Sequence, residues 1–100
     1  MKINVPEQEE KEIRAGNVNG KSTALDALKM TLSAYADVVA FVRFRNVVCK
    51  LGAVTEDGKK VFWLENDAYD SIDDMLFNAE IDGVPLYNFQ YAELIRTYTL

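Results

Sequence analysis

The sequence predicts a small α+β domain. We expect a long N-terminal helix packed on an antiparallel hairpin, or on a three-stranded sheet, followed by two shorter helices. Two observations carry this prediction: an apolar stripe with helical spacing over residues 22–44, and an Asp-Gly turn between two apolar runs after it. The 100 residues are 49% apolar, which suffices for one core. We expect a single domain over residues 22–100. Residues 1–21 hold few large apolar side chains and are expected to form a flexible or loosely docked arm.

The long helix is predicted from apolar positions that recur every three or four residues. These positions are Leu25, Leu28, Leu32, Tyr35, Val39 and Val42. Ser22 or Thr23 is the expected N-cap, and Asp26 completes a capping box with Thr23. The segment VVAFVRF at residues 38–44 is β-branched and aromatic, which favours a strand, but it continues the stripe without an intervening Gly or Pro. We therefore predict one helix to about Phe44 and keep a strand over 38–44 as the alternative.

A β-hairpin is predicted at Asp57-Gly58, which lies between the runs NVVCKLGAV and KKVFWLE. Asp-Gly supplies the two positive φ angles that a type I′ turn requires. In this register Val54 faces Val61. A two-stranded ribbon is marginal on its own, so the long helix must cover one of its faces.

Two shorter helices are predicted in the C-terminal part of the chain. Ser71 and Asp74 form a second capping box, and Asp82-Gly83 is expected to end the helix that follows. The inward stripe of this helix consists of Ile72, Met75, Leu76 and Ala79. Over residues 86–100 the apolar side chains follow a helical period, although Tyr87, Phe89 and Tyr91 also alternate as in a strand. We predict a helix there and keep a strand as the alternative.

The segment AGNVNGKS at residues 15–22 matches the loose form of a phosphate-binding loop. Such a loop must leave a buried strand and enter a helix, but the preceding residues EQEEKEIR are too polar for a buried strand. A chain of this length also has no room for the parallel sheet that phosphate-loop enzymes build. We interpret Asn19-Gly20 as a turn and predict that the segment binds no nucleotide.

The residue types limit the chemistry of the chain. Without histidine, Ser-His-Asp and Cys-His catalysis and His-containing metal sites are excluded. The single Cys49 lies in an alternating apolar run and is predicted to be a buried thiol. The aspartates between residues 67 and 74 lack the spacing of a calcium loop. We therefore predict no enzymatic activity and no catalytic, metal-binding or cofactor-binding residues.

Location and partners follow from hydropathy and charge. No apolar run approaches the roughly 20 residues of a membrane span, and the N-terminus MKINVPEQEE lacks the apolar region of a signal peptide. We expect a cytoplasmic protein that binds no membrane. The net charge is −5, and residues 61–100 hold eight acids against Arg96 alone, giving −7. Direct nucleic-acid binding is not expected, because the chain repels phosphate.

Seven acids without an intervening base lie between Glu65 and Asp82, next to several aromatic residues. Helix-start preference explains those at residues 70–74, and a turn explains Asp82. The stretch is interpreted either as a solvated face or as a surface for a basic protein partner. Phe62 and Trp63 face opposite sides of their strand, and Phe77 lies off the inward stripe of its helix. The predicted partner-binding residues are Trp63, Glu65, Asp67, Phe77 and Glu80.

Three functions follow from this pattern. The first is a non-catalytic interaction module that binds a basic protein or a second copy of itself as a homo-oligomer. The alternative is a small-ligand module, with an aromatic pocket between the hairpin and the C-terminal helix, lined by Trp63, Tyr87 and Tyr91. A small enzyme is the third hypothesis, supported only by scattered carboxylates and tyrosines.

Overall fold

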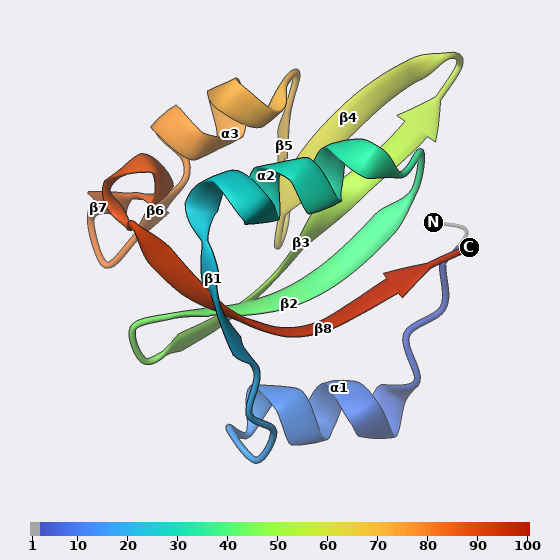
Figure 1. The fold of residues 1–100 in the computed structure, drawn as a ribbon. Helices are drawn as coiled ribbons and strands as arrows, with labels where there is room; N and C mark the ends of the chain where they lie inside the picture. Colours follow the sequence, from blue (N-terminus) through green and yellow to red (C-terminus); the bar gives the residue numbers. More distant parts are fainter. Residues whose placement is uncertain (1–2) are drawn as a thin grey trace.

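A six-stranded antiparallel sheet organises the protein, for which the computed structural model describes residues 3–100 (Figure 1). Its strands are β1 (Lys21–Ala24), β2 (Val38–Phe44), β3 (Val47–Glu56), β4 (Lys59–Leu64), β5 (Asp67–Tyr69) and β8 (Tyr91–Thr99). The other elements are α1 (Glu7–Arg14), α2 (Leu25–Ala34), α3 (Ile72–Asn78), the small hairpin of β6 (Glu80–Ile81) and β7 (Val84–Pro85), and the 3-10 turn η1 (Leu86–Asn88). The strand order is β1-β8-β2-β3-β4-β5. The α+β class is confirmed.

The prediction of one long helix over residues 22–44 is wrong. The chain forms edge strand β1, helix α2 and central strand β2 in this region. β2 is buried along almost its whole length. A strand that is buried on both faces is apolar at consecutive positions, so it satisfies a helical stripe as well. The N-cap of α2 is Ala24, so the capping by Ser22 or Thr23 is also wrong.

The predicted hairpin is confirmed in β3 and β4. Val54 pairs with Val61, as expected from the turn position. Asp57 and Gly58 have φ angles of 52° and 77°, which are the two positive values that type I′ requires. The sheet around this hairpin has six strands, however, and not the two or three that were predicted.

The prediction of a C-terminal helix over residues 86–100 is wrong. The helical part is the single 3-10 turn η1, and residues 91–99 form β8. This strand inserts between β1 and β2, which end at Ala24 and Phe44, far earlier in the chain. The alternation of aromatic residues that was kept as the alternative is therefore the correct indication for β8.

Helix α3 begins at the predicted capping box. The backbone N–H of Asp74 donates a hydrogen bond of 3.0 Å to Ser71 Oγ. The helix ends at Asn78, earlier than predicted. Asp82 and Gly83, with φ angles of 52° and 79°, instead form the turn between β6 and β7. A second Asp-Gly hairpin thus stands where the sequence was interpreted as a helix end.

The sheet separates two hydrophobic cores. Helices α2 and α3 cover one face, and α1 covers part of the other (Figure 1). The smaller core joins Ile3 and Ile13 to Val39 and Phe41 of β2. Helix α1 thus lies within the segment that was expected to form an arm, and its Ile13 is fully buried. Residues 1–2 of that segment lie outside the described residues.

The segment AGNVNGKS joins α1 to edge strand β1. It leaves a helix and enters a strand, which is the reverse of the order in a phosphate-binding loop. The turn lies at Gly16, with a φ of 84°, and not at Asn19-Gly20 as predicted. Gly20 instead lies against β8, where a Cβ atom would be only 2.2 Å from the carbonyl oxygen of Leu94.

Candidate functional site

Exposed aromatic side chains gather where α3 meets η1. Phe77 and Tyr87 are 58% and 59% exposed. Their rings are stacked, with 4.9 Å between the ring centroids and an interplanar angle of 23°. Tyr91 is 64% exposed and lines a hollow of about 600 Å³ together with Tyr87 and Asp26. Glu80 is exposed on β6, where it pairs with Pro85, two residues before Tyr87. We call Asp26, Phe77, Glu80, Tyr87 and Tyr91 the aromatic face.

The local sequence explains why Phe77 and Tyr87 meet. Met75 and Leu76 fill the core, so the next residue of α3 points outward. The backbone N–H of Leu86 donates a hydrogen bond of 3.0 Å to the carbonyl of Ala79, which holds η1 against the end of α3. Leu86 is buried, and Tyr87 therefore stands beside Phe77 on the surface.

The charges around the aromatic face are mainly negative. Asp26 and Glu80 are exposed, and neither forms an ion pair with another residue in the described part of the chain. The nearby cation Lys29 binds Asp73 at 2.7 Å. An approaching cationic group therefore meets two exposed carboxylates and three aromatic rings.

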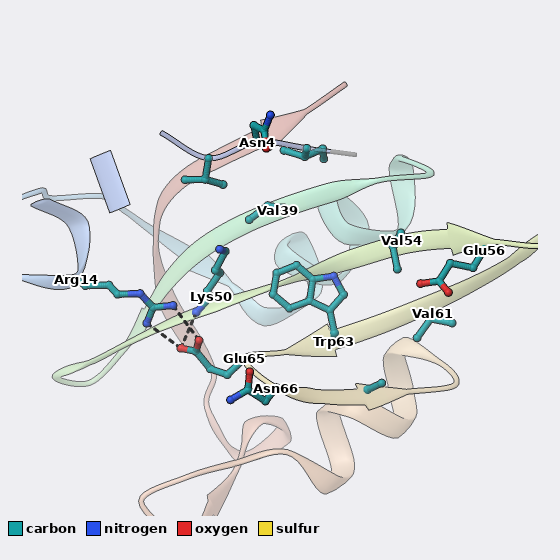
Figure 2. Close-up of a pocket in the computed structure, with 13 residues that line it drawn as sticks. Asn4, Arg14, Val39, Lys50, Val54, Glu56, Val61, Trp63, Glu65 and Asn66 are labelled. Atoms are coloured by element: carbon teal, nitrogen blue, oxygen red, sulfur yellow. Dashed lines mark hydrogen bonds and ion pairs between the residues drawn. The ribbon is translucent and has the colours of Figure 1, made fainter. Parts of the chain in front are cut away.

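A second candidate site is a hollow of about 690 Å³ on the α1 side of the sheet (Figure 2). Its floor consists of Val39, Val54, Val61 and Trp63. The segment of residues 3–5 lines it as well, and Figure 2 shows Asn4 beyond Val39. We call this the Trp63 hollow.

Gly52 shapes the Trp63 hollow. It pairs with Trp63 across β3 and β4, and a Cβ atom there would lie 2.9 Å from Trp63 Cζ2. The bare backbone therefore leaves room for the indole to spread over β3, as Figure 2 shows. The indole N–H is buried and finds no acceptor within residues 3–100. A buried unpaired donor destabilises a fold by about 1–3 kcal/mol, a cost that the packing of the indole against the smaller core offsets.

An ion-pair cluster closes one end of the hollow. Arg14 donates to both carboxylate oxygens of Glu65, at 3.0 and 2.9 Å, and to Glu10 at 2.8 Å. Lys50 Nζ donates to Glu10 at 3.1 Å, and the backbone N–H of Lys50 donates to Glu65 at 3.1 Å. These contacts tie α1 to β3 and to the turn before β5. The two cations and two carboxylates of the cluster are thus paired with one another.

The five predicted partner-binding residues do not share one surface. Trp63 and Glu65 line the Trp63 hollow, while Phe77 and Glu80 belong to the aromatic face beyond the other side of the sheet. Asp67 begins the edge strand β5. The predicted opposite orientation of adjacent Phe62 and Trp63 is confirmed, since they belong to different cores.

The predicted ligand pocket between the hairpin and a C-terminal helix is not formed. That helix is replaced by β8, and Trp63 lies on the α1 side while Tyr87 lies beside α3. Sequence reasoning also missed Asp26 as a neighbour of Tyr87 and Tyr91. The alternation of Tyr87, Phe89 and Tyr91 indicated a strand near this position. It did not indicate that α2, which carries Asp26, lies next to these residues.

The acidic stretch over residues 65–82 is partly structural. Three of its acids form ion pairs with cations of other elements: Glu65 with Arg14, Asp70 with Lys59, and Asp73 with Lys29. The Asp74 carboxylate accepts a hydrogen bond of 2.6 Å from the side chain of Asn78. The remaining acids of this stretch are Asp67, Glu80 and Asp82, which are exposed.

Other chemistry finds little support in the structure. Cys49 is buried, as predicted, and burial together with the charge of Glu65 raises the pKa of its thiol to about 11. Within residues 3–100, no three or more acidic, cysteine or histidine side chains are grouped to hold a metal ion. The helices in that range are too short or too polar to cross a membrane.

Comparisons with known proteins give no matching family model, no matching curated protein and no matching solved structure. The function is therefore inferred from the chemistry of the two candidate sites.

The ion-pair cluster predicts acid sensitivity. Hydrogen bonds from Arg14 and Lys50 hold the pKa of Glu10 below its ordinary value of 4.5 despite burial. Burial opposes ionisation of Glu65, but bonds from Arg14 and Lys50 outweigh it and also lower the pKa. Because the folded pKa values are depressed, this stabilisation is complete above pH 4.5 and is lost as the pH falls through the folded values.

We therefore expect the free energy of unfolding, measured by urea denaturation, to fall with acidification below pH 4.5. The double variant Glu10→Gln and Glu65→Gln is expected to be less stable at neutral pH and to show a flatter acid dependence. Glu7→Gln, at an exposed position of the same helix, is the matched control. An acid dependence that is identical in wild type and double variant would contradict the assignment.

Proposed function

We propose that the protein is a non-catalytic interaction module that binds a basic segment of a partner protein through the aromatic face. The observation that carries this proposal is the exposed stack of Phe77 on Tyr87. Large apolar rings in contact with water are unfavourable, and their burial by a partner releases free energy. The stack is held from both sides, by α3 and by η1, so its rings lose little conformational freedom on binding.

Charge complementarity supports a basic partner. Asp26 lines the hollow of Tyr87 and Tyr91, and Glu80 lies three residues after Phe77. The region over residues 61–100 carries a net charge of −7, eight acids against one base. A partner arginine or lysine over an aromatic ring gains a cation–π interaction of about 0.5–2 kcal/mol. The surrounding negative potential accelerates encounter with a positive surface.

The test is a pull-down from cell extract followed by affinity measurement with the purified partner. We expect Phe77→Ala and Tyr87→Ala each to weaken binding about tenfold or more, because aromatic anchors at an interface centre lose more than about 1 kcal/mol on truncation. Tyr35→Ala is the matched control, since Tyr35 is 46% exposed at the other end of α2. Asp26→Asn combined with Glu80→Gln is expected to slow association, as is raised salt.

The outcomes separate the alternatives. A partner that wild type, both aromatic variants and the control retain equally would place the functional surface elsewhere. If the wild type forms a dimer in analytical ultracentrifugation and Phe77→Ala is monomeric, the partner is a second copy of the chain and not a basic protein.

A further inference from the structure

We propose that the Trp63 hollow binds a neutral, planar heteroaromatic molecule with an amide-like edge, the chemical class to which nucleobases belong. This inference is independent of the aromatic face. The hollow measures about 690 Å³. Small-molecule sites span roughly 300–1,000 Å³, and the Trp63 hollow lies within this range. Its lining consists of seven apolar residues and six polar or charged ones.

The floor of the hollow favours a flat ligand. One face of the indole lies against the bare backbone at Gly52, so its other face is turned toward the hollow (Figure 2). Val39 and Val54 extend this apolar floor on either side of the ring. Nucleobases stack on aromatic side chains, and this stacking tolerates different ring systems.

The charges of the hollow favour a neutral ligand. Arg14 is paired with Glu65, and Lys50 with Glu10, so a charged ligand would have to displace an existing partner. The remaining charged group of the lining is Glu56, which would repel an anion. The chain as a whole carries a net charge of −5, and this disfavours phosphorylated forms of the same molecule.

Two carboxamides supply the polar recognition. Asn4 and Asn66 both line the hollow, and neither side chain forms a hydrogen bond within residues 3–100. Each carboxamide offers donors and an acceptor next to one another. The Watson–Crick edge of a nucleobase presents the complementary arrangement, and proteins bind unstacked bases through such edges combined with aromatic stacking.

Trp63 is the only tryptophan of the chain, so its fluorescence reports on the hollow directly. We expect saturable quenching on titration with adenosine, guanosine, cytidine or uridine, at least one of which should bind. The monophosphate of that nucleoside is expected to bind at least tenfold more weakly, and ribose is expected to cause no change. Calorimetry with the same probes checks that quenching reflects binding.

Variants test the assignment of the site. Asn66→Ala and Asn4→Ala are each expected to weaken binding of the responding nucleoside about fivefold or more, with an unchanged circular dichroism spectrum. Phe77→Ala is the control and should bind the nucleoside as wild type does, whatever its effect on a protein partner. Asn66→Asp should weaken binding further, because it adds a charge and removes donors.

Two results would overturn the proposal. The first is the absence of saturable quenching or heat with all four nucleosides at millimolar concentration. The second is tighter binding of the monophosphate, or of a single-stranded oligonucleotide, than of the free nucleoside, which would assign the hollow to an anionic ligand or to nucleic acid.

Discussion

Gly52→Ala is expected to lower the free energy of unfolding by about 3 kcal/mol, which is near the upper end for overpacked cores. A Cβ atom at this position would lie 2.1 Å from the carbonyl oxygen of Val38 and 2.9 Å from Trp63 Cζ2. Val38 belongs to the central strand β2, which is paired on both sides, so its backbone has little freedom to move away. The indole would be displaced as well, which disturbs the Trp63 hollow.

Gly58→Ala is the matched control for this prediction. Gly58 has a φ of 77°, but a Cβ atom there would meet nothing within 4 Å. Its substitution therefore introduces backbone strain without a steric clash, and we expect a loss of about 1 kcal/mol. Urea denaturation of both variants gives the comparison. A larger loss in Gly58→Ala than in Gly52→Ala would show that β2 and β3 are not packed as described.

Local interactions of the fold were predictable from the sequence. The turn at Asp57-Gly58 and the cap at Ser71 each depend on a few adjacent residues whose conformational preferences are strong. The opposite orientations of Phe62 and Trp63 follow from the two-residue period of a strand. In each case the physical cause lies within the segment itself.

Strand partners distant in sequence were not predictable in the same way. β8 lies between β1 and β2 because hydrogen bonds join residues 91–99 to partners that lie 50 or more positions earlier. The residues of β2 carry no polar alternation, since both of their faces are covered, and their apolar run fits a helix equally well. Tertiary burial therefore determines that β2 and β8 are strands, although their local patterns also fit helices.

The candidate sites were predicted only in part. Phe77 was expected on the surface from its helical position, and it is exposed. Its neighbour Tyr87 depends on η1, which forms only because Leu86 is buried and hydrogen-bonded to the end of α3. The Trp63 hollow depends on α1, whose sequence EQEEKEIR is mostly polar, and on residues 3–5, whose two apolar side chains are too few to form a recognisable pattern.

The second large effect on stability is expected from a substitution in helix α1, because a single buried apolar side chain anchors this helix to the sheet. Ile13 is fully buried in the smaller core with Val39 and Phe41, while ion pairs join the polar side chains of α1 to the sheet. We expect Ile13→Ala to lower the free energy of unfolding by about 2–4 kcal/mol, since truncation leaves a cavity that the stiff sheet does not fill.

Lys11→Ala, at an exposed position of the same helix, is the control for Ile13→Ala and should change stability by less than about 0.5 kcal/mol. Hydrogen exchange of the α1 amides provides a second measurement. In a docked helix these amides are protected and lose protection in Ile13→Ala, whereas in a loosely docked arm they exchange fast in both proteins. Equal denaturation midpoints for wild type and Ile13→Ala, with fast exchange throughout α1, would make residues 1–21 a loosely docked arm. The Trp63 hollow would then lose the wall formed by residues 3–5, and α1 would contribute nothing lasting to its charged end.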